Sequence, residues 1–312
     1  MVVCPDRRSE PVKVFCRVRP VDDSEETCIS VLDDCTLVTQ SKQGSSGKQG
    51  FYSFSRVFAP GASQEFVFSE TLLPCVERVL NGENALLFTY GVTSSGKTYT
   101  MQGDLEDPGL LPRSLDIIFN SIASYSTLKY VVKPTGQNGF VLQSEAEAIM
   151  DRQRLDYTCN PRTPSRPEIN TPSFETRVRE TESVPLSKKS LYAVFVSFIE
   201  LYNNNIHDLL APTPSLGRYC NSITSPCPPS LPRSHNLRED GNRNIYVPGI
   251  TETEVKTADE ALKLFYQGRK RRHVASTALN EASSRSHSIF TIRIVRAGYD
   301  PNYDEVIQVP FY

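Results

Sequence analysis

The chain has 312 residues, of which 38% are hydrophobic and 22% are charged, and its formal net charge is -2. These values are typical of a soluble globular protein with one sizeable core or two smaller ones. A balance this close to neutral gives no global electrostatic case for nucleic acid or anionic membrane as a partner, although local patches remain open.

Cysteine and histidine usage gives no sign of a disulfide framework or a zinc site. The eight cysteines form no C-x-x-C pair, and the four histidines do not fall at zinc-ligand spacing from them. The first ten residues are polar and predict no signal peptide, and the apolar stretches are far shorter than the roughly 20 residues that span a bilayer. We expect a reducing, intracellular compartment and no membrane partner.

The first part of the chain predicts short strands and a kinked helix. Residues 12–20 (VKVFCRVRP) alternate and are rich in β-formers, so they predict a strand that ends at its proline. Residues 41–50 predict a Gly/Ser loop, and residues 51–58 predict a short strand. A helix is predicted over residues 63–82, capped by its serine and kinked at Pro74.

The next stretch combines a buried strand with a long excursion. Residues 85–90 (ALLFTY) are continuously apolar, which predicts a strand buried on both faces of a sheet. Helices are predicted to begin at residues 96–98 and to run over 112–123. Residues 127–190 contain six prolines and little periodicity, which indicates an insertion with one short helix near 144–155.

The last part returns to regular elements. Residues 191–202 (LYAVFVSFIELY) predict a buried strand, 211–232 a Pro/Ser-rich loop, and 288–295 an alternating strand. Residues 257–260 form a capping box at the start of a helix. Strands that alternate with helices predict an α/β fold with a mainly parallel or mixed central sheet flanked by helices.

A phosphate-binding P-loop is the strongest functional signal. The segment follows the predicted 85–90 strand and opens a helix, and it matches G-x-x-x-x-G-K-[ST]; a chance match is on the order of one in a hundred or less. Inward-turned backbone N–H groups and a helix N-terminus favour phosphates, Lys97 reaches the terminal phosphates, and Thr98 holds Mg²⁺. A plain Gly/Ser turn would explain neither Lys97 nor the placement. The motif comprises Gly91, Val92, Thr93, Ser94, Ser95, Gly96, Lys97 and Thr98.

A second polar cluster covers residues 280–287 (NEASSRSH). Two adjacent hydroxyls, an arginine and an amide on one loop are able to order a water and clamp a γ-phosphate. A polar loop entering the following strand is the alternative, and on spacing alone it is the safer interpretation.

Several blocks together resemble the kinesin motor superfamily, which settles that choice. The blocks occur in the family's order from residue 11 to about 296, which makes the resemblance highly specific. Val92 and the long insertion, including residues 145–154 (EAEAIMDRQR), most resemble the kinesin-6 group, and within it the centralspindlin type. Tyr99 replaces the commoner histidine that stacks on adenine, and as an aromatic residue it fits the same role. The matching segments are 17–20 (RVRP), 85–101 (ALLFTYGVTSSGKTYTM), 109–113 (GLLPR), 200–210 (ELYNNNIHDLL) and 272–287, which ends in NEASSRSH.

The resemblance implies ATP and Mg²⁺ as cofactors, and it implies roles for individual residues. Arg17, Pro20 and Tyr99 are expected to frame the adenine, while residues 91–98 hold the phosphates. Mg²⁺ is expected at Thr98 and Ser284. The roles implied for the polar loop are γ-phosphate sensing by Ser283 and Ser284, water positioning near Asn280, and a switch salt bridge from Arg285.

The resemblance also implies microtubules as the partner. Residues 235–249, with Arg238 and Arg243, match the loop that touches tubulin in kinesins. The basic run 269–272 (RKRR) is interpreted as the solvated end of a helix rather than a nucleic-acid patch. Full-length relatives dimerise through a stalk, and the implied location is cytoplasmic and cytoskeletal, on spindle and midzone microtubules, with the nucleus as an alternative in interphase.

One departure from the family lies near the end of the chain. Kinesins continue into a D-L-A-G-S-E switch II segment, and no D-x-x-G follows residue 288 here. The expected organisation is a tail at 1–10, a partial motor domain at 11–296 and a tail at 297–312 that does not resemble a motor. We therefore expect a motor fold that is incomplete at its C-terminus, from an incomplete gene model, a fragment or a splice product of a full motor. Such a chain is expected to bind nucleotide weakly, to hydrolyse it poorly and not to walk.

The sequence leaves one alternative to an ATP-driven motor open and argues against another. A chain that retains only the family's ancestry would act, if at all, as a non-enzymatic interaction module. A GTPase needs an N-K-x-D motif to read guanine, and the sequence contains none.

Overall fold

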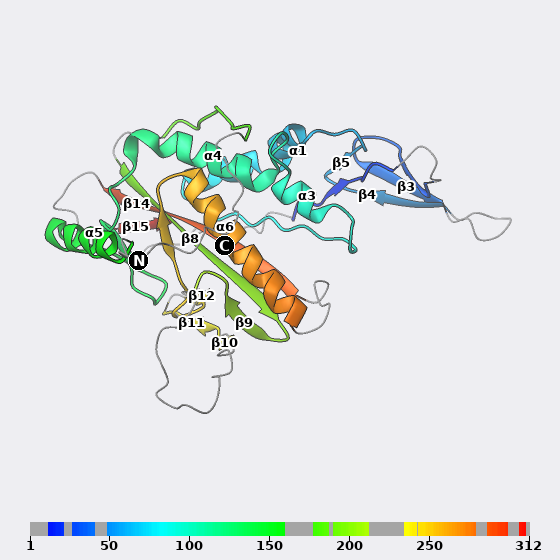
Figure 1. Ribbon diagram of the computed structural model, residues 1–312. Helices are drawn as coiled ribbons and strands as arrows, with labels where there is room; N and C mark the ends of the chain where they lie inside the picture. The colour runs from blue at the N-terminus through cyan, green and yellow to red at the C-terminus, as the bar shows by residue number, and fades with distance from the viewer. Residues whose placement is uncertain are drawn as a thin grey trace, which may run out of the picture. The chain divides into compact units, whose positions relative to one another are not determined.

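The computed structural model describes residues 12–21, 27–40, 49–159, 177–186, 190–211, 234–241, 243–278, 286–298 and 306–309. Its contacts divide the chain into two compact units (Figure 1). Unit 1 comprises residues 1–73 and 89–110, and unit 2 comprises residues 74–88 and 111–312. Residues 41–48 of the loop predicted at 41–50, residues 212–232 of the loop predicted at 211–232, and residues 280–285 of the polar cluster at 280–287 lie outside the described residues. Gln49 and Gly50, expected in the first loop, instead begin a strand, β4 (Gln49–Ser53).

Unit 1 contains two small sheets and two short helices. Its parallel pair is β1–β5, its antiparallel sheet has the order β2-β3-β4, and all other described strand pairs are antiparallel, apart from an isolated parallel bridge between Ser126 and Tyr192. The expected mixture of parallel and antiparallel strands is therefore spread over separate sheets. The elements are β1 (Phe15–Arg17), β2 (Ile29–Val31), β3 (Thr36–Gln40), β4 (Gln49–Ser53), β5 (Arg56–Phe58), α1 (Gln64–Thr71) and α3 (Lys97–Gln102).

Two predicted strands of unit 1 are corrected. The strand expected over 12–20 is confined to β1. The single strand expected over 51–58 is two strands in different sheets, because the chain changes partners between them. The amide of Phe54 donates to the Cys35 carbonyl at 2.9 Å, and the next amide, that of Ser55, donates to the Val14 carbonyl at 2.7 Å.

The helix predicted over 63–82 is confirmed, with its break at the proline. The Ser63 hydroxyl caps α1 by accepting from the Phe66 amide at 3.1 Å. The helix stops at Thr71, and α2 (Leu73–Leu80) begins one residue before Pro74. Because proline has no N–H to donate, it is tolerated in the first turn of α2 but not inside one continuous helix.

Unit 2 is organised on a six-stranded sheet of order β10-β9-β8-β14-β15, with β13 also paired to β8. The strands predicted over 191–202 and 288–295 are confirmed as β8 and β14. They pair antiparallel along their whole length, from Ser190 opposite Gly298 to Tyr202 opposite Ser286. The strands are β8 (Ser190–Tyr202), β9 (Asn205–Asp208), β10 (Ser234–His235), β13 (Thr253–Val255), β14 (Ser286–Gly298) and β15 (Val306–Val309).

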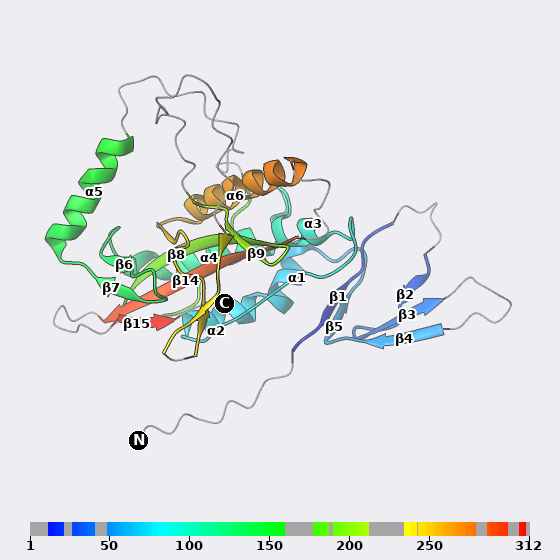
Figure 2. The ribbon, with the colours of Figure 1, turned by 90° about the horizontal axis from the view of Figure 1, so that it is seen from below.

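Helix α6 (Ala258–Ala278) lies across one face of this sheet (Figures 1 and 2). The Phe265 ring stacks on the Phe198 ring of β8 at 5.2 Å. The predicted capping box is present: the Thr257 hydroxyl accepts from the Glu260 amide at 3.1 Å, while the Glu260 carboxylate accepts from the Lys256 amide at 2.9 Å. The helix predicted over 112–123 is α4 (Leu110–Ile122), followed by a 3-10 turn at Ala123–Tyr125.

The first part of the insertion is ordered structure. Strands β6 (Val132–Pro134) and β7 (Phe140–Leu142) form a hairpin, and α5 (Glu145–Cys159) confirms the helix predicted near 144–155. Helix α5 starts with a reciprocal cap between Ser144 and Glu147, whose hydrogen bonds lower the pKa of the Glu147 carboxyl. Residues 160–176 lie outside the described residues.

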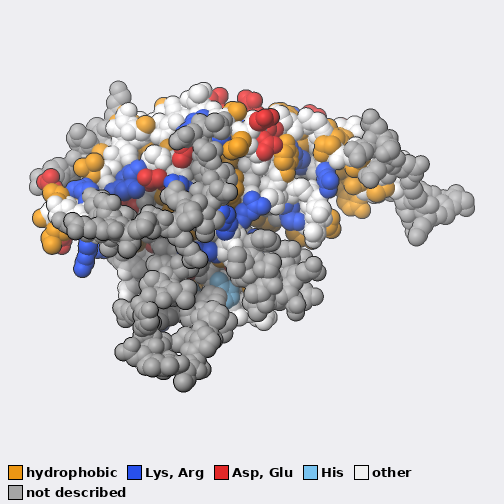
Figure 3. All heavy atoms as spheres, viewed as in Figure 1, with side chains coloured by type: hydrophobic (Ala, Val, Ile, Leu, Met, Phe, Trp, Pro, Cys, Tyr) orange, Lys and Arg blue, Asp and Glu red, His pale blue; other side chains and the backbone are white. Residues whose placement is uncertain are grey.

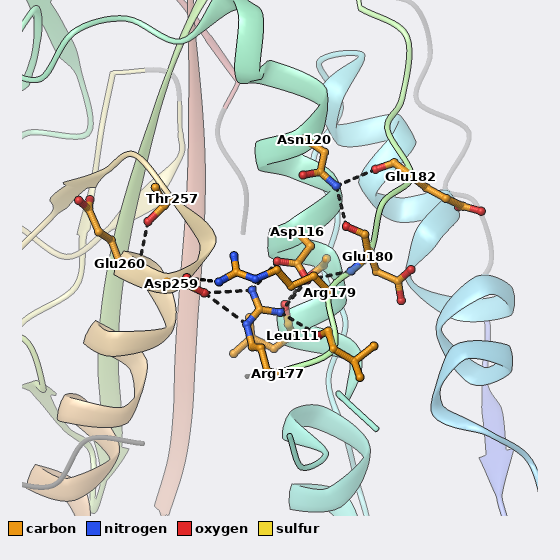
Figure 4. A network of polar contacts seen from close by, with 12 residues as sticks. Leu111, Asp116, Asn120, Arg177, Arg179, Glu180, Glu182, Thr257, Asp259 and Glu260 are labelled. Atoms are coloured by element: carbon orange, nitrogen blue, oxygen red, sulfur yellow. Dashed lines mark hydrogen bonds and ion pairs between the residues drawn. The ribbon is translucent and has the colours of Figure 1, made fainter. Parts of the chain in front are cut away.

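The end of the insertion is fastened between α4 and α6 by a buried ion pair (Figure 4). The Arg177 guanidinium donates to Asp116 of α4 at 2.6 Å and to Asp259 of α6 at 3.2 Å. The Arg177 and Asp116 side chains are only 3% and 5% exposed. Burial alone would lower the pKa of Arg177, but the hydrogen bonds and charge of Asp116 raise it, so the guanidinium stays charged.

The strand predicted over 85–90 is wrong. No strand is present between residues 83 and 92, and no described strand pairs with this stretch. Leu86, Phe88 and Tyr90 are 69%, 71% and 95% exposed. Apolar residues raise the tendency to form a strand, but a strand also needs a neighbour for its N–H and C=O groups.

None of the helices in the described part of the chain is both long and apolar enough to cross a membrane.

We predict that Arg177→Ala lowers the free energy of unfolding by about 3–5 kcal/mol, because it leaves the Asp116 carboxylate buried without its partner. Arg179→Ala is the matched control. Its side chain is 46% exposed and pairs with Asp259 at the surface, so it should cost less than about 1 kcal/mol. Urea unfolding monitored by circular dichroism measures both, and equal losses would contradict the assignment.

Candidate functional site

The predicted P-loop lies in unit 1 and opens α3. Gly96 precedes the helix with φ 95°, and Ser94 has φ 64°. Gly91 has φ 151°, and a Cβ added to it would lie 2.5 Å from the Ser95 hydroxyl. The glycines at 91 and 96 are therefore required by backbone geometry and close approach, as the motif predicts. The helix predicted to open here is confirmed, and it has six residues.

Lys97 is held against its own loop. Its ammonium donates to the Gly91 and Val92 carbonyls, both at 2.7 Å. An ammonium has three donors, so this arrangement still allows one N–H to reach a phosphate oxygen. The neighbouring Thr98 is exposed.

The two arginines of the RVRP segment serve different parts of the site. The Arg17 guanidinium lies over the Tyr99 ring at 5.2 Å and donates to the Thr100 hydroxyl at 3.1 Å. The Arg19 guanidinium donates to the Ser94 carbonyl in the P-loop at 2.6 Å. The structure thus brings Arg17 and Tyr99 into contact and adds Arg19 as a support of the phosphate loop, while the adenine-side role of Arg17 and Tyr99 stays a prediction.

Gln64 is the residue of this site that sequence reasoning missed. Its side chain is fully buried, accepts from Arg17 at 2.7 Å and donates to the Tyr99 carbonyl at 2.7 Å. Burial lowers the pKa of the Arg17 guanidinium below its ordinary value. Pro20 lies three residues beyond Arg17, is exposed, and has no described contact that tests its adenine role.

This set of residues fits a nucleoside triphosphate. Gly96 has nothing within 4 Å of where a Cβ would stand, so the loop is open to a ligand there. A backbone with left-handed turns and a lysine suits phosphate oxygens. The Arg17–Tyr99 pair offers an aromatic face to a base.

The catalytic residues proposed for the polar loop cannot be placed. Asn280, Ser283, Ser284 and Arg285 lie outside the described residues. The described flanks are joined by Arg272 of α6, which donates to the Ser286 carbonyl at 3.0 Å and to the Glu200 carboxylate at 3.0 Å.

The interpretation of residues 269–272 as a purely solvated helix end is therefore partly wrong. Arg271 also has structural partners, because it donates to the carbonyls of Leu209 and Ala211 at 2.8 and 2.6 Å. Arg269 and Lys270 are exposed. Lys and Arg side chains gather on the visible face where α6 crosses the sheet (Figure 3).

The two arginines expected to touch tubulin share one hairpin. Arg238 lies in β11 (Arg238–Glu239), which pairs antiparallel with β12 (Ile245–Tyr246). Arg243 lies in the connecting turn with φ 64°, and both arginines are exposed.

Comparison with known proteins shows the family of this chain. The family described as kinesin motor domain matches residues 17–308, which spans the RVRP segment, the P-loop and both long strands. The chain belongs to the kinesin motor domain family.

Two similar relatives and one solved structure place the chain near the kinesin-6 branch of that family. The chain is 42% identical to kinesin-like protein KIF23 of Mus musculus over 96% of its own length and 32% of that protein. It is 32% identical to kinesin-like protein KIF20A of Bos taurus, over 92% of its length and 37% of that protein. A solved structure titled kinesin 6 matches with a TM-score of 0.77 at 30% identity, covering 96% of this chain and 73% of that one.

These matches cover the motor part of larger proteins. The chain spans about a third of the length of the curated relatives it matches. A second solved structure, of a fast kinesin, matches with a TM-score of 0.64 at 25% identity over 96% of this chain and 63% of that one. The α/β kinesin motor fold expected from the sequence is thereby confirmed.

We predict that Tyr99→Ala weakens ATP binding by about tenfold while leaving inorganic tripolyphosphate binding unchanged. Stacking of an aromatic ring on a base contributes about 1–3 kcal/mol, and the phosphate loop is untouched. Calorimetric titration of both ligands measures this, with Tyr52→Ala on β4 as an exposed aromatic control. An equal loss for both ligands would show that Tyr99 supports the loop instead of the base.

Proposed function

We propose that this chain is an ATP-driven microtubule motor domain of the kinesin-6 type, acting in mitosis and cytokinesis. The observation that carries the proposal is the P-loop geometry, with Lys97 at its carbonyls and with Tyr99 of α3 stacked against Arg17 of β1. Membership of the kinesin motor domain family supports ATP as the nucleotide.

The proposed chemistry divides the work among residues of this chain. Mg²⁺-ATP, when bound, supplies the phosphoryl group, and its metal neutralises charge on the phosphates. Lys97 and Thr98 hold the phosphates and the metal, with Ser284 as a further metal-side residue. Ser283, Arg285 and Asn280 are the proposed γ-phosphate sensor, switch ion-pair partner and water-positioning residue.

The proposed partner is the microtubule. The exposed arginines of the β11–β12 hairpin, Arg238 and Arg243, are the cations that this role uses. In the intact protein we place dimerisation in a stalk and the location on spindle and midzone microtubules. Similarity to KIF23 and KIF20A supports these assignments.

A second candidate, a non-motile interaction module, is favoured by one observation. The chain that leads into the P-loop is irregular at 83–90 and exposes large apolar side chains, so no described sheet braces the phosphate loop from that side. A loop without that support would bind nucleotide weakly and turn it over slowly.

We predict that microtubules stimulate only slow phosphate release by this chain, as its expected weak nucleotide binding implies, and that Lys97→Ala abolishes both ATP binding and the release. Lys97 is the cation of the phosphate loop, so its loss removes the main charge complement of the phosphates. Lys263→Ala, an exposed lysine on α6, is the control and should behave like the wild type. A phosphate-release assay with and without polymerised tubulin measures the effect.

The outcomes separate the two candidates. Stimulated release that depends on Lys97 supports the motor. Microtubule binding without any ATP turnover supports the interaction module. ATP affinity unchanged by Lys97→Ala would overturn the P-loop assignment itself.

A further inference from the structure

The insertion hairpin is packed into the core of unit 2. Val132 and Phe140 from the hairpin share one buried cluster with Ala193 and Phe195 of β8 and Val295 of β14. The Phe140 and Phe195 rings are 4.8 Å apart. Side-chain packing therefore determines the position of the hairpin on the sheet, and with it the position of the hairpin turn.

The turn of this hairpin contacts a buried arginine of the sheet. Arg293 of β14 is 8% exposed and pairs with Glu252 at 2.7 Å. Its guanidinium also lies over the Phe140 ring at 4.8 Å and donates to the Asn138 side-chain oxygen at 3.0 Å. A buried cation needs such partners, so Arg293 holds the hairpin turn as well as its own ion pair.

Asn138 is oriented by its neighbours on both sides. Its carboxamide oxygen faces the Arg293 guanidinium, and its nitrogen donates to the Asp240 carboxylate at 3.1 Å. Arginine only donates and a carboxylate only accepts, so no other orientation of the amide satisfies both. The residue has φ 65°, and the Thr135 hydroxyl, which accepts from the Gly139 amide at 3.2 Å, closes its turn.

Asp240 in turn organises the β11–β12 hairpin. Its carboxylate accepts from the Asn244 amide at 2.8 Å and from the Asn244 side chain at 3.1 Å. Its backbone carbonyl accepts from the Arg243 amide at 3.0 Å. The same residue that Asn138 contacts therefore sets the turn that carries Arg243.

We propose that Asn138 is a positioning residue for microtubule binding, through which the insertion holds the β11–β12 hairpin in place against the sheet. The inference rests on the proposed function for the role of that hairpin. Its content is the chain of contacts from Arg293 to Asn138, to Asp240 and to the turn at Arg243. The insertion thus contributes to binding through its contact with the β11–β12 hairpin.

The variants separate the amide from the backbone and from the fold. Asn138→Gly removes the carboxamide and keeps a residue that accepts φ 65°. Asn138→Asp keeps the contact with Arg293 and places two carboxylates against each other at Asp240. Gln137→Gly, an exposed position in the same turn, is the matched control.

We predict that Asn138→Gly weakens microtubule binding about threefold to tenfold, the loss expected for one hydrogen bond of ordinary strength, because the contact acts on binding only through the hairpin. Asn138→Asp should weaken binding more, and Gln137→Gly should leave it unchanged. Co-sedimentation of the full chain with polymerised tubulin measures affinity. Hydrogen exchange of the Arg243 and Asn244 amides, measured without tubulin, should accelerate in the same order.

The two readouts distinguish failure of this inference from failure of the proposed function. If the wild-type chain does not sediment with microtubules, the proposed function fails, and hydrogen exchange still decides whether Asn138 holds the hairpin. Unchanged exchange in Asn138→Gly overturns the contact chain. Faster exchange with unchanged microtubule affinity overturns the positioning role.

Discussion

The antiparallel pairing of β8 with β14 is the interaction on which unit 2 depends. It runs the full 13 residues of both strands and brings together parts of the chain about ninety positions apart. One end of the pair carries Ser286, held by Arg272 of α6, and its interior carries the buried Arg293 opposite Phe195. Helix α6 and the insertion hairpin both pack against this strand pair, so the pair determines where the site residues of unit 2 lie.

Unit 1 depends on a different kind of contact, in which polar groups are buried and fully engaged. Gln64 links the Arg17 guanidinium to the backbone of α3 at Tyr99, while Arg19 holds the loop at Ser94. A buried amide of this kind is costly unless both of its ends are bonded. This one hydrogen-bond network therefore positions both the groups expected beside the base, Arg17 and Tyr99, and the phosphate loop. The positions do not depend on a long helix α3.

Local signals explain which features could be predicted from sequence. The P-loop, the Thr257 capping box and the break at Pro74 each depend on residues within one or two turns. The strand at 191–202 is indicated by its apolar run, and the strand at 288–295 by its alternation of residue types. Residues 85–90 carry the same apolar signal, yet form no strand, because pairing depends on a neighbour distant in sequence. Gln64, Arg272 and Asn138 went unrecognised since their partners lie 47, 72 and 155 positions away, respectively.

The buried Arg177 has a consequence for how this chain tolerates added length. The insertion is anchored at one end by the hairpin on β8 and β14, and at the other by Arg177 between α4 and α6. A reporter or an affinity tag added between Cys159 and Arg177 would lie between these two anchors, so neither anchor would need to move.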